Sequence, residues 1–248
     1  MRASKSGIAA TLGLAVLIAL ALATWAWPRE GHAKPALGLF TSLPIYWKES
    51  ASVGEALGDG GTRHWVREAL ESEHRLVLLD TLDSGELAKL DSLVMAQPRP
   101  LAPQENVALD DWVRGGGRVL LFADPLLTEH SWFAIGDRRR PQDVILLSPI
   151  LRRWGLELTF DEDQADGERL VAYHSASLPE RMSGRLRTVG SEGDSAQCAI
   201  ESGGLVAQCG IGKGSAVVVA DAALLEADRQ VGPGKAALEA LMLEAFVR

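Results

Sequence analysis

The clearest pattern along the chain is an apolar run, a helical stretch and a second apolar run between residues 93 and 125. Leu93–Ala96 is apolar throughout, as a strand buried on both faces would be. Apolar side chains then recur at helical spacing at Val107, Leu109, Trp112 and Val113, and the glycines 115–117 end this helix. Arg118–Ala123 is again largely apolar. Because both strands lack a polar face, the pattern predicts a parallel strand–helix–strand unit in a sheet covered on both sides.

The rest of the chain continues this alternation of short apolar runs and helical patterns. We expect further strands at 37–43, 75–79 and 210–220, and helices at 64–73, 84–90, 150–154 and 235–246. Between about 156 and 210 the predicted strands are short and separated by turns, which favours a small antiparallel insertion. Residues 36–248 are therefore predicted to form one α/β domain with a parallel sheet and this insertion.

The N-terminal segment Gly7–Trp27 carries no charge. Its length matches the roughly 20 residues that cross a bilayer. Arg2 and Lys5 precede it, which favours a cytoplasmic N-terminus at residues 1–6 and a domain in the periplasm, joined by a tether at 28–35. A cleaved signal peptide is the alternative, with a small-residue site at Gly31–Ala33. Either interpretation exports the domain; the first makes it a single-pass protein of the inner membrane.

The two cysteines test that location. Cys198 and Cys209 flank a segment with Gly203 and Gly204 at its centre, which predicts a tight hairpin. Pairing outward from the two glycines sets the cysteines opposite each other. In an oxidising compartment this register predicts a disulfide, with free thiols as the alternative. A metal site is not expected here, because no second pair of ligands accompanies the cysteines.

Charge limits the classes of partner. The formal net charge is −8, which disfavours nucleic acid and anionic lipid surfaces as partners. Arg138–Arg140 form one short basic cluster, either a solvated loop or an anion site. No cofactor is predicted, because the glycines 210, 212 and 214 precede a strand instead of following one, unlike a dinucleotide-binding fingerprint.

Candidate chemistry lies where strands are predicted to end. Asp80, Asp124 and Asp221 each follow such a strand, and ligands of α/β sheets bind outside the carboxyl ends of strands. His130 lies on the long loop after Asp124 and could join Asp124 and Asp221 in a metal or acid–base site. The alternative is that these aspartates cap the following turns. 

An aromatic pair offers a different kind of site. Tyr46 and Trp47 follow the first predicted strand and could line a pocket or a partner surface. Packing beneath the long loop after Asp124 is the alternative.

Three segments together resemble a known family. Residues 93–125, Ser148–Leu156 and Gly212–Asp221 are similar to the extracytoplasmic domain of gliding-motility-type ABC-transporter auxiliary proteins. The resemblance spans residues 37–221 and implies a flavodoxin-like fold of the class I glutamine-amidotransferase type. The strand ending at Ala123 leads to Asp124 instead of a cysteine, so glutaminase activity is not expected. The implied partners are separately encoded permease and ATPase subunits.

These features predict a non-enzymatic, membrane-anchored accessory domain of an ABC-type transport or envelope complex. It would bind a partner or ligand at the carboxyl edge of the sheet, at Asp80, Asp124, His130, Asp221, Tyr46 or Trp47. Two alternatives stay open. One is a metal-dependent or acid–base hydrolase that uses Asp124, Asp221 and His130, and the other is a glycan-binding module that uses Tyr46 and Trp47.

Overall fold

The computed structural model describes residues 33–49, 63–190, 196–226 and 231–247. Residues 35–248 form one compact unit. The predicted anchor Gly7–Trp27 lies outside the described residues. Among the helices of the described ranges, none is both long and apolar enough to cross a membrane.

The unit contains eleven strands and five α-helices over these described ranges. The strands are β1 (Ala36–Thr41), β2 (Arg75–Leu78), β3 (Ser92–Ala96), β4 (Arg118–Phe122), β5 (Leu156–Thr159), β6 (Arg169–Tyr173), β7 (Ala176–Glu180), β8 (Arg185–Thr188), β9 (Gln197–Glu201), β10 (Val206–Ile211) and β11 (Gly214–Val219). The helices are α3 (Trp65–Glu73), α4 (Ser84–Leu87), α5 (Pro103–Gly115), α6 (Ser148–Arg153) and α7 (Val231–Phe246).

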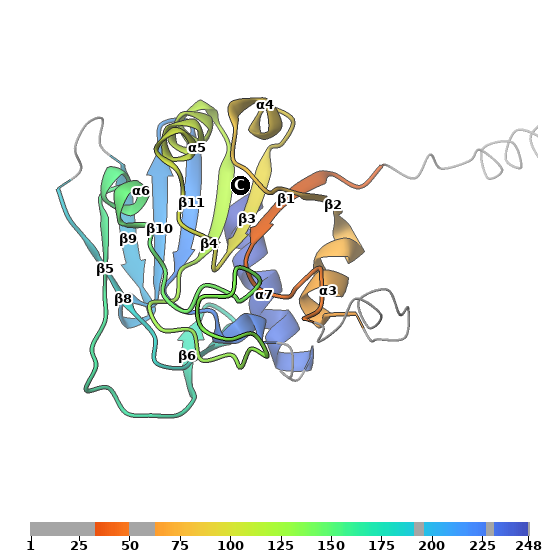
Figure 1. The fold of residues 1–248 in the computed structure, drawn as a ribbon. Helices are drawn as coiled ribbons and strands as arrows, with labels where there is room; N and C mark the ends of the chain where they lie inside the picture. Colours follow the sequence, from red (N-terminus) through yellow and green to blue (C-terminus); the bar gives the residue numbers. More distant parts are fainter. Residues whose placement is uncertain (1–32, 50–62, 191–195, 227–230, 248) are drawn as a thin grey trace, which may run out of the picture. The chain divides into compact units, whose positions relative to one another are not determined.

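A seven-stranded sheet in the order β2-β1-β3-β4-β11-β10-β9 forms the centre of the unit (Figure 1). The five strands from β2 to β11 are parallel, as the apolar runs predict. β3, β4 and the second half of β11 are buried throughout, apart from the half-buried Arg118. Helices α3 and α7 pack together behind the sheet, and α5 lies in front of it with α4 and α6 beside it (Figure 1). The mixed α/β architecture with a mostly parallel sheet is therefore confirmed.

The central strand–helix–strand unit folds as its sequence indicates. Pro103 opens α5, where a missing N–H group costs no hydrogen bond. The carboxylate of Glu105 accepts a hydrogen bond from Ala102 N at 2.8 Å, which satisfies one of the free donors at the helix start. Gly116 follows the helix with φ 128°, a conformation that glycine adopts without strain. β3 and β4 then pair in parallel register, with Leu93 opposite Val119.

The cysteine hairpin forms with the predicted register. Cys198 and Cys209 are opposite each other in the antiparallel pair of β9 and β10, and they form a disulfide. The two glycines of the turn have φ values of 65° and 95°. The disulfide prediction is confirmed.

The predicted insertion over 156–210 is only partly separate from the main sheet. β5 pairs with β8 and β6 with β7 in two small sheets, as expected of an insertion. The hairpin β9–β10 instead continues the main sheet, because β10 pairs antiparallel with β11 along its whole length. The sequence pattern did not predict β7, whose Pro179 argues against a strand. Pro179 is tolerated because β7 has only one partner strand.

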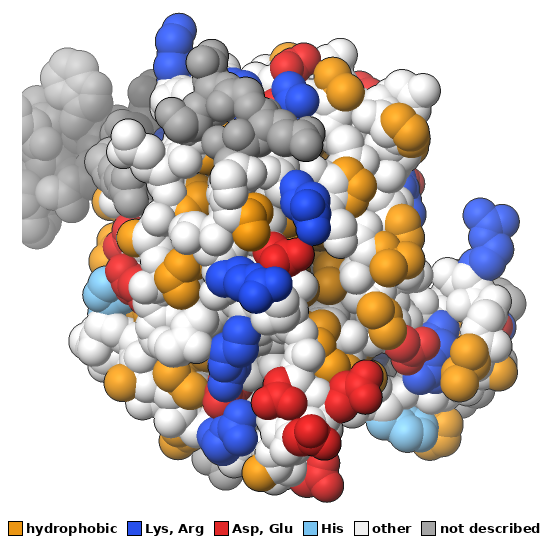
Figure 2. All heavy atoms as spheres, turned by 90° about the vertical axis from the view of Figure 1, so that its left-hand side faces the viewer, with side chains coloured by type: hydrophobic (Ala, Val, Ile, Leu, Met, Phe, Trp, Pro, Cys, Tyr) orange, Lys and Arg blue, Asp and Glu red, His pale blue; other side chains and the backbone are white. Residues whose placement is uncertain are grey.

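The antiparallel side of the molecule is a mosaic of charges. Figure 2 shows basic and acidic side chains close together there, with hydrophobic ones scattered among them. Glu157 on β5, for example, pairs with Arg152 at 3.0 Å and with Arg187 at 2.6 Å. Such charges discourage edge-to-edge pairing of strands between molecules.

Candidate ligand-binding site

The order in which the chain adds strands to the sheet reverses once near its start, and the carboxyl ends of the strands at this reversal form a topological switch point. From β1 the chain goes to β2 on one side and then to β3 on the other, so the switch lies between β1 and β3. Ligands of open α/β sheets bind at such a switch. Here Ser42 Oγ donates to Gln97 O at 2.5 Å and accepts from Gln142 N at 2.9 Å. The protein's own groups therefore occupy this position.

Ser42, Gln97 and Gln142 together form a hydrogen-bonded plug at the switch point. Gln97 is its central residue, and the sequence pattern did not single it out. It follows β3, has φ 43° and is fully buried. Its Nε2 donates to the carbonyls of Asp124 and Gln142 at 2.9 and 2.8 Å, and its Oε1 accepts from Asp124 N at 2.9 Å. A left-handed residue at a strand-to-helix turn is the geometry that presents a nucleophile in some hydrolases. In this chain that position holds an amide engaged with backbone.

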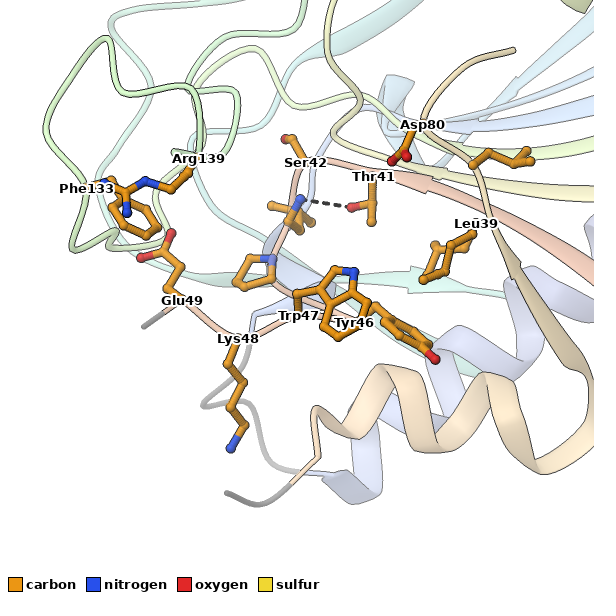
Figure 3. A pocket seen from close by; sticks show the side chains of 14 residues that line it. Leu39, Thr41, Ser42, Tyr46, Trp47, Lys48, Glu49, Asp80, Phe133 and Arg139 are labelled. Carbon is orange, nitrogen blue, oxygen red and sulfur yellow. Dashed lines mark hydrogen bonds between the residues drawn. The ribbon is translucent and has the colours of Figure 1, made fainter. Parts of the chain in front are cut away.

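A cavity of about 310 Å³ opens next to the plug, at the carboxyl ends of β1 and β2 (Figure 3). Its apolar floor consists of four leucines from β1, β2 and the residues that follow these strands, namely Leu39, Leu43, Leu78 and Leu79. Around the floor lie Thr41, Ser42, Pro44, Tyr46, Trp47, Lys48, Glu49, Asp80, Phe133 and Arg139. Three predicted site residues, Asp80, Tyr46 and Trp47, thus come together in one cavity.

Arginines partly cover two of the three aromatic rings in the cavity wall. The guanidinium carbon of Arg67 lies 3.8 Å from the centroid of the Tyr46 ring, and that of Arg139 lies 4.2 Å from the Phe133 centroid. The Trp47 ring meets Tyr46 edge to face at 5.0 Å and is 75% exposed. Trp47 is therefore not packed beneath the long loop.

The loop 126–147 forms the far wall of the cavity and is fastened to the loop after β1. Glu49 accepts hydrogen bonds from Ser131 Oγ at 2.7 Å and from Trp132 N at 2.9 Å. This contact brings Phe133 and Arg139 opposite Trp47 (Figure 3). Arg139 and Arg140 are ion-paired with Asp137 and Asp143, which favours the solvated-loop interpretation of the basic cluster.

Asp124 and Asp221 each follow a strand, as predicted, and the structure makes these two strands neighbours. Their carboxylates act as caps. Asp124 accepts from Leu126 N at 2.8 Å and Ala222 N at 3.1 Å, and Asp221 accepts from Arg181 N at 2.7 Å and from Ala223 N. Burial raises the pKa of Asp124 to about 7 and that of Asp221 well above its usual range, and their mutual repulsion adds to the rise for Asp221. Each oxygen is thus already bound to backbone.

His130 lines a cavity whose lining includes neither Asp124 nor Asp221. This second cavity, of about 280 Å³, is also lined by Trp132, Glu129 and His64, among others. Burial lowers the pKa of His64 to about 4, and its Nδ1 accepts from Val66 N at the start of α3. Among the described residues, no group of three or more His, Cys, Asp or Glu side chains could hold a metal ion. Of the three residues of the hydrolase alternative, Asp124 and Asp221 thus bind backbone N–H groups and His130 lines a different part of the surface.

The glycines 210, 212 and 214 lie at the hairpin of β10 and β11, with Gly210 in β10 and Gly214 at the start of β11. Gly212 adopts φ 60° in the turn between β10 and β11. At Gly214 a side chain would clash with the carbonyl oxygens of Val113 and Gly117, where α5 ends. The turn interpretation of Gly210–Gly214 therefore holds.

The fold and the cavity define an α/β protein with a mostly parallel sheet and a ligand-sized cavity at its carboxyl edge. No family model matches the chain, and no curated protein matches it. Among solved structures, an exo-β-1,4-mannosidase from Opitutaceae bacterium strain TAV5 is similar at 17% identity and a TM-score of 0.49, over 84% of this chain and 36% of that one.

Two further solved structures show the range of similar proteins. A β-galactosidase from Bacillus circulans sp. alkalophilus has 12% identity and a TM-score of 0.45, over 85% of this chain and 31% of that one. A ThuA-like protein from Bacteroides uniformis has 12% identity and a TM-score of 0.45, over 89% of this chain and 94% of that one.

These comparisons correct one prediction. The expectation of a non-enzymatic protein is contradicted, because the solved structures similar to this chain include glycoside hydrolases. The chain spans about a third of the length of those two enzymes. At such identities and TM-scores neither their activities nor their substrates transfer to it.

Proposed function

We propose that the chain is a membrane-anchored accessory domain of an ABC-type transport or envelope complex, and that it binds a ligand or partner in the cavity beside Trp47. We further propose that its sheet is of the flavodoxin-like, class I glutamine-amidotransferase-like type. The strand order β2-β1-β3-β4-β11 supports this proposal, since flavodoxin-like sheets follow the same order.

One observation carries the proposed binding role. Asp80 follows β2, Trp47 follows β1 and Phe133 belongs to the long loop after β4, yet all three line one cavity at the carboxyl edge of the sheet. Concave sites with an apolar floor and a few polar groups are typical of ligand binding. Its volume of about 310 Å³ suits a small molecule or one protruding group of a larger partner.

The membrane and transport parts of the proposal have separate support. The uncharged segment Gly7–Trp27 has the length and the flanking charges of an anchor. The disulfide between Cys198 and Cys209 suits an oxidising compartment such as the periplasm. The resemblance of residues 37–221 to ABC-transporter auxiliary domains supplies the expected partners, a permease and an ATPase.

Affinity purification tests this proposal. The full chain with a C-terminal tag is captured from native membranes in a mild detergent, and co-purified proteins are identified by mass spectrometry. We expect a permease and an ATPase subunit in amounts comparable to the chain. Capture in which neither accompanies the chain would contradict the proposed complex. An unrelated single-pass protein with the same tag is the control.

Protease accessibility tests the location independently. Protease added to intact spheroplasts should digest residues 36–248 while leaving a cytoplasmic marker protein intact. Protection of the domain until the cells are lysed would place it in the cytoplasm and overturn the topology.

A further inference from the structure

We propose that the cavity beside Trp47 binds a neutral saccharide unit, with Trp47 as the stacking surface and Asp80 as a hydrogen-bond acceptor. This inference rests on the proposed role of the cavity as the ligand site, and it names the class of ligand. Three independent features of the cavity lead to it.

The first feature is a single open aromatic ring. Arg67 and Arg139 lie over the Tyr46 and Phe133 rings, so neither ring is fully open. Trp47 is 75% exposed at the rim of the cavity (Figure 3). A sugar ring presents C–H groups on one face, and these pack well on the electron-rich face of an indole. Trp47 is therefore the stacking surface within the described cavity wall.

The second feature is the balance of charge. Two basic side chains, Lys48 and Arg139, line the cavity together with two acidic ones, Glu49 and Asp80. Just outside the lining, Asp137 pairs with Arg139 and the Arg99 cation attracts Asp80, which adds one charge of each sign. Electrostatic complementarity would favour a charged ligand only where one sign were in excess. The equal numbers favour a neutral ligand with many hydroxyl groups.

The third feature is which polar groups are available. Thr41 Oγ1 donates to Ala96 O and accepts from Leu43 N, and Ser42 Oγ is held in the same way by Gln97 and Gln142. The exposed Asp80 carboxylate makes no hydrogen bond to any described residue, although its carbonyl accepts from Arg99 at 2.7 Å. A carboxylate at a cavity rim accepts strong hydrogen bonds from hydroxyl groups.

Isothermal titration calorimetry on the full chain tests the inference. The chain is kept in a detergent without a sugar headgroup, because maltoside and glucoside detergents would compete. The probes are cellobiose, maltose, lactose and N,N′-diacetylchitobiose, each at millimolar concentration. We expect at least one of them to bind. Saturation-transfer NMR should then show transfer to the C–H face of one sugar ring.

Substitutions locate the binding. Trp47→Ala should weaken binding about tenfold, whereas Trp47→Phe, which keeps a ring, should weaken it less. Asp80→Ala should also cost about tenfold. The matched control is Trp132→Ala, since Trp132 is 79% exposed but lines the other cavity, and it should leave the affinity unchanged. All these side chains are exposed, so the fold should tolerate the changes.

The outcomes separate this inference from the proposed function. Absence of binding by all four disaccharides, or binding that Trp47→Ala leaves intact, overturns the saccharide inference. If choline or citrate binds instead and Trp47→Ala abolishes that binding, the cavity remains the ligand site and only the class of ligand is wrong. Absence of the permease and the ATPase from the affinity-purified sample would instead contradict the proposed function, whether or not a disaccharide binds.

Discussion

The side-chain amide of Gln97 holds both backbone polar groups of Asp124. Its Oε1 accepts from Asp124 N and its Nε2 donates to Asp124 O, both at 2.9 Å, so the amide closes a two-bond ring across the ends of β3 and β4. Neither residue is exposed beyond 1%. Because buried polar groups left without partners are costly, this contact fixes where the long loop after β4 begins.

Gln97→Ala should therefore destabilise the protein strongly. The change removes the partner of the Asp124 N–H group and of the Gln142 carbonyl, whereas the Asp124 carbonyl still accepts from Ile145 N at 3.1 Å, and we expect the free energy of unfolding to fall by about 3 kcal/mol. Urea unfolding monitored by circular dichroism measures the loss. The control is Gln208→Ala, which removes one 3.4 Å contact to Tyr173 and should cost below about 1 kcal/mol. Equal losses in the two variants would contradict the role of Gln97.

The buried pair of aspartates predicts an unusual dependence of stability on pH. Burial holds the pKa of Asp124 at about 7 and raises that of Asp221 in the same direction, whereas an unfolded aspartate titrates near 3.9. The folded state thus binds protons more tightly between these pH values. The free energy of unfolding should fall as pH rises from about 4 to about 7.

Two other carboxylates act in the opposite direction but in a different window. Hydrogen bonds from Arg99 lower the pKa of Glu105 to about 2, and those from Arg114 and Arg153 outweigh burial and lower the pKa of Asp110. Their contribution is present above about pH 4 and is lost below it. Between pH 4 and 8 the buried pair is opposed by His64, whose pKa burial lowers from 6.5 to about 4, so the contribution of the pair is read by comparing the thermal unfolding of variants with that of the unchanged protein. Asp124→Asn should flatten the slope there, and the exposed Asp111→Asn should not.

The disulfide should contribute measurably to stability. Closing a loop between residues 11 apart is worth about 3 kcal/mol in the chain-entropy model. The double variant Cys198→Ser, Cys209→Ser should lose about this amount in urea unfolding. Dithiothreitol should lower the stability of the unchanged protein to that of the variant and leave the variant unaffected. If the double variant were as stable as the oxidised protein, the disulfide would make no contribution to the free energy of unfolding.

Gly214 and Gly210 offer a matched pair of substitutions in one turn region. Gly214→Ala would place a methyl group against the carbonyls of Val113 and Gly117, so α5 would have to shift, at a cost of about 2 kcal/mol. Gly210→Ala meets no atom within 4 Å, and it should change the melting temperature little. Scanning calorimetry compares the two. A melting temperature for Gly214→Ala equal to that of Gly210→Ala would contradict the close contact.

Sequence pattern predicted the parts of this fold that depend on neighbours along the chain. The unit from β3 to β4 has a periodic helix between two apolar strands, and its proline and glycine boundaries are local signals. The pairing of Cys198 with Cys209 followed from counting outward from two glycines. The capping role of Asp124 was one of two alternatives, and the choice needed the position of Ala222.

The remaining features depend on contacts between distant segments. Glu49 meets Ser131 across 82 residues, and this contact decides which side chains face Trp47. Gln97 carries no local signal, because its partners Asp124 and Gln142 lie on another loop. Thr41 ends β1 and Ser42 follows it, whereas the sequence pattern extended this strand to residue 43, so their place beside the cavity was not anticipated.

The position of β11 has a consequence for the order in which this molecule is made. β11 is the last strand along the chain, yet it lies inside the sheet between β4 and β10. Until it is synthesised, β4 has no neighbour on one side and the hairpin β9–β10 has nothing to join. A chain truncated before Gly214 would therefore expose the apolar flank of β4, and completion of the sheet must wait until nearly all of the polypeptide is available.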